Sequence, residues 1–187
     1  MAIGIEFGDG NPNLFCDSKF WGDPDMPDDM QYPMLDGRPL TFLCQISLYD
    51  IAELDPDELL PHDGMLYFFA DIDDLLGYDT GVRHEAGEWP KGHAAVKFTK
   101  TVNMETFQSQ IQLDDEDKPL TQKAVPLTFS ACDPSFGGLR MLGASTEGYV
   151  TLLSIPFDPQ HRLRFEIKDT DLGFGNWKKA RFIMEVM

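Results

Sequence analysis

The chain alternates between short apolar runs and clusters of Asp, Pro and Gly, and this alternation restricts it to few kinds of fold. The segments 40–48 and 65–70 are nearly continuous apolar runs, which are typical of buried strands. A short helix is expected at 55–60, because Asp55 precedes a proline at the first helical position. The pattern predicts an α+β fold that is mostly β, with few short helices. Further strands are expected at 94–99, 125–130, 149–155, 162–168 and 180–186, with a less regular segment at 106–113.

Two parts of the sequence echo each other. Leu43–Leu48 resembles Leu152–Phe157, and Leu66–Leu75 resembles Leu163–Leu172. A strand–turn–strand unit that occurs twice predicts two similar strand-pair halves packed into one domain. We therefore expect a single domain over 1–187, with an irregular acidic segment at 1–39, a first half at about 40–76 and a second half at about 149–187.

Negative charge is concentrated in the N-terminal part of the chain. Residues 1–80 contain 18 Asp and Glu against Lys19 and Arg38, so they contribute −16 of the total charge of −17. Such a surface repels nucleic acid and anionic membranes and attracts basic proteins. The alternative is that the acidity serves solubility alone.

The location of the protein is predicted from what its sequence lacks. The first residues have neither a basic start nor an apolar run, so no signal peptide is expected, and no stretch approaches the length of a membrane span. The three cysteines, Cys16, Cys44 and Cys132, show no paired spacing. Reduced thiols in a cytoplasmic protein are the simplest interpretation.

Metal and cofactor motifs are absent from the local sequence, so we expect neither a metal nor a cofactor. The four histidines do not follow zinc-ligand spacing, and a cluster of His84, His93 and Cys132 would have to be assembled by folding. The segment 71–76 does not satisfy the EF-hand pattern. Recurrent Asp-x-Asp pairs leave a weak divalent-ion site open, but turn and capping roles explain most of them.

Catalytic motifs are also absent. There is no G-x-S-x-G elbow, no cysteine in a basic context and no P-loop. Paired carboxylates remain open, because their spacing is spatial rather than sequential. We therefore expect a protein that is not an enzyme.

Aromatic and Met side chains lie among the acids of the N-terminal segment. They could anchor a cationic partner, or they could cover one end of the β core. Our prediction for a partner-binding surface comprises Trp21, Tyr32, Asp28, Asp29, Asp55, Asp57 and Glu58, and we expect these acids to be exposed.

Several ordered motifs resemble those of the YwqG-like family. They are Ser18–Pro24, Pro39–Ile46, Leu60–Pro61 and Gly64–Phe69, and the later segment Met141–Gly143 has a counterpart as well. Trp21 departs from the pattern, which has a glycine there. The resemblance implies a mostly β fold with two similar halves. The family is largely of unknown function, and its association with bacterial toxin-neutralising loci implies an immunity-like role.

Two functional hypotheses follow. In the first, the acidic N-terminal part engages a basic protein, as an inhibitor of a nuclease-like toxin would, by placing carboxylates where phosphates normally bind. In the second, the chain is a small-molecule or metal-dependent enzyme with its site between the two halves. A pocket lined by polar residues from both halves, with perturbed carboxylates, favours the enzyme, and a convex acidic face without a pocket favours the partner.

Overall fold

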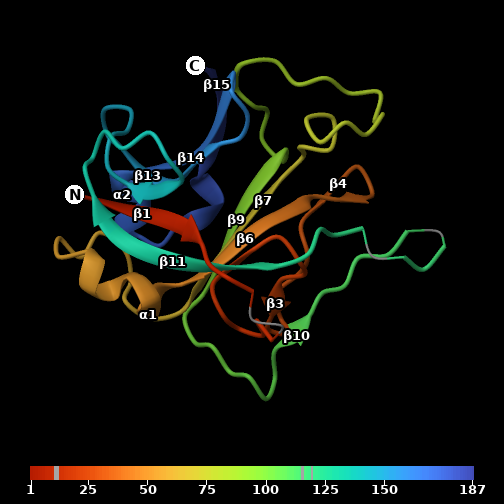
Figure 1. The fold of residues 1–187 in the computed structure, drawn as a ribbon, viewed down its shortest axis with the longest axis horizontal. Helices are drawn as coiled ribbons and strands as arrows, with labels where there is room; N and C mark the ends of the chain where they lie inside the picture. Colours follow the sequence, from red (N-terminus) through yellow and green to blue (C-terminus); the bar gives the residue numbers. More distant parts are fainter. Residues whose placement is uncertain (11–12, 115, 119) are drawn as a thin grey trace.

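The protein folds around one curled antiparallel sheet of 11 strands, shown in Figure 1. This computed structural model describes residues 1–10, 13–114, 116–118 and 120–187. Strands make up 39% of the chain and helices 8%, which confirms the predicted mostly β fold. Across the sheet the strands are β8 (Gly87–Glu88), β15 (Arg181–Val186), β14 (His161–Lys168), β13 (Tyr149–Pro156), β12 (Arg140–Leu142), β1 (Ala2–Phe7), β11 (Val125–Cys132), β2 (Lys19–Phe20), β6 (Thr41–Ser47), β7 (Met65–Ala70) and β9 (Ala94–Thr99).

Four short strands form two ribbons outside the main sheet. β3 (Asp25–Met26) pairs with β10 (Gln108–Ser109), and β4 (Met34–Leu35) pairs with β5 (Arg38–Pro39). The predicted segment 106–113 therefore contributes only a two-residue strand. The predicted strands 65–70 and 94–99 match β7 and β9 to the residue.

The strand β1 is central to the sheet, although residues 1–39 were expected to be irregular. It pairs with β11 on one side and β12 on the other. Ile3 and Ile5 are buried in the core, while Phe7 is exposed. The alternation of Ile3 and Ile5 with smaller or polar residues is the sequence signal for this strand, and turn residues further along the segment obscured it.

The core explains why β7 is apolar at every position. Leu66 and Phe68 face a large apolar cluster shared by both ends of the sheet, whereas Met65, Tyr67 and Phe69 face a second, smaller cluster. Both faces of β7 are thus buried, as a continuous apolar run predicts. Apolar residues of the predicted strands 40–48, 65–70, 149–155 and 162–168 lie in the core, among them Phe42, Leu43, Ile46, Leu66, Phe68, Leu153, Ile155, Leu163 and Phe165.

The prediction of a helix at 55–60 is wrong. Two short helical segments come earlier, α1 (Leu48–Ile51) and the 3-10 turn η1 (Ala52–Leu54). The chain leaves helical geometry at Asp55, and Glu58 adopts a positive φ of 49°, which an α-helix does not allow. The carboxylate of Asp55 instead accepts the Leu60 N–H at 2.8 Å and closes a turn.

A helix also follows β14, and this bears on the two-half organisation. The order strand, α-helix, 3-10 turn, strand occurs as β6–α1–η1–β7 and again as β14–α2–η2–β15, with α2 at Asp169–Gly173 and η2 at Trp177–Lys179. β6 and β14 each lie third from an end of the sheet, and β7 and β15 each lie second. The echo in the sequence instead relates β6 to β13 and β7 to β14, so this order of elements leaves the predicted repeat untested, and it stays a prediction. An overlay of β6 and β7 on β13 and β14 tests it.

Candidate functional site

A cavity of about 300 Å³ lies beside β6, between the turn that follows β2 and the segment that precedes β11. Aromatic rings of Trp21, Tyr32, Phe42 and Tyr78 line it, with Leu40, Leu76 and Leu120. Its polar lining includes Arg38, Asp73, Gln112, Thr121 and Gln122. A mostly apolar concavity with a few polar groups is the usual form of a small-molecule binding site. Such sites have volumes of about 300–1,000 Å³, and this cavity is at the lower end of that range.

Trp21 reaches the cavity because the backbone turns sharply at the end of β2. The φ of Trp21 is +59°, and the Trp21 N–H donates to the Leu43 carbonyl at 2.7 Å. Gly22 follows with a φ of +76°, and a Cβ at this position would lie 2.7 Å from that of Ala124. Glycine is therefore required at position 22 for this approach. The edge of the Phe20 ring packs against the indole at 5.0 Å between centroids.

Tyr32 forms another wall of the cavity. Its hydroxyl donates to the Leu40 carbonyl at 2.9 Å. Its ring packs in an edge-to-face arrangement with the Phe69 ring, with 5.2 Å between the ring centroids. Burial, with the nearby carboxylates of Asp23 and Asp73, raises the pKa of the Tyr32 phenol well above its usual range. The phenol therefore stays neutral, and its hydrogen bond fixes the ring.

Arg38 and Asp73 are the charged residues of the lining. Thr41 Oγ1 donates to Asp73 Oδ1 at 2.5 Å, which fixes that carboxylate on the wall. The Arg38 side chain is 43% exposed, and its Nη2 lies 3.9 Å from Asp71 Oδ1. The cavity thus combines aromatic walls with one cation and one anion.

A buried polar network lies on the other side of Gly22. The Asp25 carboxylate is fully buried and accepts from Lys19 Nζ at 2.7 Å, from the Cys16 N–H at 2.8 Å and from Ser109 Oγ at 2.5 Å. Gln45 also contacts it, and the Tyr67 hydroxyl donates to the Asp25 carbonyl at 2.7 Å. The attraction within a buried ion pair offsets its desolvation only when further hydrogen bonds are made, and both oxygens of Asp25 accept such bonds here.

This network is built by cross-strand register. Lys19 on β2 lies opposite Gln45 on β6, which lies opposite Tyr67 on β7. Directly opposed residues on neighbouring strands point to the same face of a sheet. Lys19, Gln45 and Tyr67 come from three separate motifs, and the fold brings them to one place.

A second polar cluster lies at the ends of β7 and β9. His84 Nε2 is 3.1 Å from His93 Nδ1 and 3.4 Å from Asp71 Oδ2, and His93 Nδ1 is 3.1 Å from the same oxygen. Asp74 Oδ1 lies 3.0 Å from His84 Nδ1. The Trp89 ring stacks on the His84 ring at 3.8 Å between centroids. Asp71, His84 and His93 could together hold a metal ion.

Folding unites His84 and His93, but not with Cys132. Asp71 takes the third place, and the Cys132 sulfur lies instead near Gly4 on β1. The spacing of the histidines gave no signal for this cluster, since its third member belongs to the end of a strand. Cys16, Cys44 and Cys132 are all free thiols.

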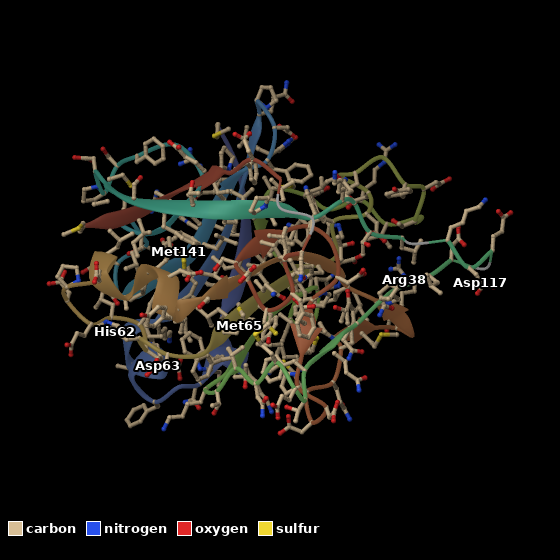
Figure 2. All side chains as sticks on the ribbon, turned by 60° about the horizontal axis from the view of Figure 1, so that its bottom comes forward. Arg38, His62, Asp63, Met65, Asp117 and Met141 are labelled. Carbon is tan, nitrogen blue, oxygen red and sulfur yellow. The ribbon has the colours of Figure 1, made fainter. Side chains whose placement is uncertain are left out.

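The predicted partner-binding residues fall into separate places. Trp21 and Tyr32 line the same cavity. Asp28 and Asp29 are exposed after β3, and Asp57 and Glu58 are exposed after η1. Figure 1 shows α1 far from β4, and Figure 2 shows His62 and Asp63 far from Arg38, so the acids after η1 lie away from the cavity.

Asp55 was predicted to be an exposed contact for a partner, and this prediction of exposure is wrong. Asp55 is only 2% exposed, because its carboxylate turns inward to accept the Leu60 N–H. The Asp55 carboxylate is therefore not accessible to a partner protein. The sequence prediction omitted Arg38, Asp73 and Asp71, whose types carried no distinguishing pattern in an acidic chain.

Residues 18–138 match a family model described as a domain of unknown function, DUF1963. The matched part contains the cavity, the Asp71, His84 and His93 cluster, and the Asp25 network except Cys16. No curated protein matches the chain. In the described part of the chain, no helix has the length and apolar character needed to cross a membrane.

Proposed function

The chain belongs to the DUF1963 family of unknown function, and from its geometry we propose that it is a non-catalytic binding protein for a basic protein partner. The observation that carries this proposal is the aromatic cavity lined by Trp21 and Tyr32, most of whose lining comes from residues 1–80, the part of the chain that contributes −16 of its charge. An apolar side chain of the partner enters the cavity. Basic residues that flank it meet the surrounding carboxylates.

Charge and shape have different roles in this proposal. Exposed acids such as Asp28 and Asp29 attract a cationic protein over a distance and raise the association rate. The cavity supplies the short-range contact, since buried aromatic anchors carry much of the energy of an interface. The lining is mostly apolar and aromatic, and its one cation, Arg38, is matched by its one anion, Asp73, so the inserted side chain is apolar or aromatic.

The enzyme hypothesis placed its site between the two halves. The described residues that line the cavity all lie between Trp21 and Gln122, so the second half at 149–187 is not part of this lining. This cavity therefore does not meet the condition for the enzyme, a pocket lined by both halves, although it is also not the convex face expected for a partner. We also propose that the chain is a YwqG-like member, because three of the motifs that carry this resemblance supply Lys19, Gln45 and Tyr67 at opposed positions of neighbouring strands. The proposal includes a cytoplasmic, immunity-like role.

A displayed library of random peptides tests the proposal. The immobilised chain should select peptides in which Lys or Arg flanks an apolar residue, and binding should weaken between about 0.05 M and about 0.5 M salt. Trp21→Ala should weaken binding of the selected peptides at least about tenfold, which corresponds to about 1.4 kcal/mol. Phe174→Ala is the control, because Phe174 is an exposed aromatic residue at the end of α2. Selected peptides without positive charge, or equal binding by both variants, would refute the proposal.

A further inference from the structure

We propose that Asp71, His84 and His93 form a binding site for a divalent transition-metal ion of the zinc type. Each residue contributes one donor atom, and these three atoms lie close together: Asp71 Oδ2, His84 Nε2 and His93 Nδ1. This site is separate from the peptide-binding role proposed above and does not depend on it.

The distances among the donor atoms fit tetrahedral coordination. His93 Nδ1 lies 3.1 Å from His84 Nε2 and 3.1 Å from Asp71 Oδ2, and His84 Nε2 lies 3.4 Å from Asp71 Oδ2. In a tetrahedral zinc site with bonds of about 2.0–2.1 Å, neighbouring ligand atoms are separated by about 3.3 Å. The three atoms therefore form one face of such a tetrahedron. The fourth position is left for water or another exchangeable ligand, as in zinc sites with three protein ligands.

Two of the three ligands are held by the sheet itself. Asp71 directly follows β7 and His93 directly precedes β9, and the last paired residues of these strands are Ala70 and Ala94. The Asp71 N–H donates to the His93 carbonyl at 2.8 Å, which continues the ladder by one step. Only His84 comes from the connecting loop. Ligands on strand ends are placed more precisely than ligands on loops.

The outer contacts orient His84 for a metal. Asp74 Oδ1 lies 3.0 Å from His84 Nδ1, and Asp74 Oδ2 accepts the His84 backbone N–H at 2.9 Å. A carboxylate on Nδ1 fixes the proton there and leaves the Nε2 lone pair free. Stacking on Trp89 fixes the plane of the ring. Arg38 approaches Asp71 Oδ1, so Oδ2 remains available.

The ligand set selects the class of ion. Two imidazole nitrogens and one carboxylate suit zinc and similar transition metals, whereas calcium and magnesium prefer oxygen ligands alone. The His93 side chain is 23% exposed, which gives an ion access from solvent. The alternative is a cluster held by hydrogen bonds alone, in which a proton on His93 Nδ1 is shared with its two neighbours.

Metal titration of the whole chain separates these alternatives. After removal of metal with a chelator, calorimetric titration with zinc chloride in excess magnesium should give one zinc per chain. Cobalt(II) added to the same protein should produce the intense visible absorption of a tetrahedral complex. Zinc at about a hundred times its Kd should raise the melting temperature by at least about 5 °C.

Three variants test the assignment. His93→Ala should abolish stoichiometric binding, and Asp74→Asn should weaken it about 10–100-fold, as changes to outer-shell partners do. His161→Ala is the matched control, because His161 also contacts an aspartate, with 2.8 Å from Nδ1 to Asp158 Oδ2, but lies outside the cluster. Absence of zinc binding or of the cobalt spectrum in the unaltered chain would overturn the proposal, even if a variant failed to fold. Displacement of zinc by magnesium, or equal binding by His93→Ala, would also overturn it.

Discussion

Gln45 and Asp25 hold each other by two hydrogen bonds. The Asp25 N–H donates to Gln45 Oε1 at 2.9 Å, and Gln45 Nε2 donates to Asp25 Oδ2 at 2.9 Å. Both side chains are completely buried. Gln45 Nε2 also donates to the Asp17 carbonyl at 2.9 Å, so the amide joins Asp17 and Asp25 of the N-terminal part to β6. Only a side chain with both a donor and an acceptor makes this set of contacts.

Gln45→Glu should therefore destabilise the fold by about 3 kcal/mol. The substitution removes the donor and places a second carboxylate beside Asp25, where Lys19 supplies the opposing charge. Urea unfolding at neutral pH measures the change. Gln31→Glu is the control, because Gln31 is exposed, and it should stay within about 0.5 kcal/mol. Similar losses in the two variants would show that Gln45 has no special role.

The acids at the end of η1 should divide into two kinds. Asp55→Ala removes a buried carboxylate that accepts the Leu60 N–H, and it should cost about 1–2 kcal/mol of stability. Thermal unfolding measures this loss. Asp57→Ala should change stability by less than about 0.5 kcal/mol, since Asp57 is exposed. Equal losses at the two positions would contradict the distinction.

Charge reversal should slow association with a cationic peptide selected by the chain. In Asp28→Lys with Asp29→Lys, we expect the association rate to fall while the melting temperature stays nearly unchanged, because both residues are exposed. The dissociation rate should change less. Stopped-flow mixing over a salt series measures both rates. An association rate that is insensitive to salt would mean that the acidity serves solubility alone.

Glu166 should make stability depend on acidity. It is fully buried, and burial alone would raise its pKa. Hydrogen bonds from the Thr146 N–H at 3.0 Å and from Arg181 at 2.8 Å, with the charge of Arg164, outweigh burial and lower the pKa below its ordinary value of 4.5. A folded-state pKa below the unfolded one stabilises the fold above the unfolded value, and this contribution is lost as pH falls from about 4.5 through the folded pKa.

Glu166→Gln should therefore cost about 3 kcal/mol at neutral pH and less at pH 3. It should also reduce the slope of stability against pH below about 4.5. Chemical unfolding at a series of pH values measures both effects. Glu105→Gln, at an exposed position, should leave the slope unchanged. An identical slope in Glu166→Gln and in the unaltered chain would show that the carboxylate makes no net contribution.

The three thiols should differ in reactivity. Burial, together with Asp25, raises the pKa of Cys16 to about 11, and burial raises that of the completely buried Cys44 as well. Cys132 is only partly buried. With a thiol reagent near pH 8, one thiol should react first, and Cys132→Ser should remove this phase. All three should react after denaturation. A fast phase that persists in Cys132→Ser would contradict this order.

Most strands could be predicted because their signal is local. Runs such as 65–70 and 94–99 are apolar enough to be recognised from neighbouring residues alone, and both match their strands. The helix at 55–60 failed because Asp55 and Pro56 suit a turn as well as a helix start, and contacts to Leu60 select the turn. β1 was missed because turn residues follow it in the sequence, and because the strands that pair with it lie more than a hundred residues away.

The sequence by itself determined the mostly β fold, the charge asymmetry and the nature of the aromatic residues, because each depends on composition or on short-range periodicity. Only the tertiary structure decided which side chains meet. The pairing of β7 with β9 places Asp71 beside His93, across a loop whose length follows no ligand-spacing rule. The backbone turn at Trp21, with its positive φ, places this residue in the lining of the cavity that Tyr32 and Arg38 also line. Sites assembled by strand register and backbone turns have no local pattern, since their members are neighbours only in the folded chain.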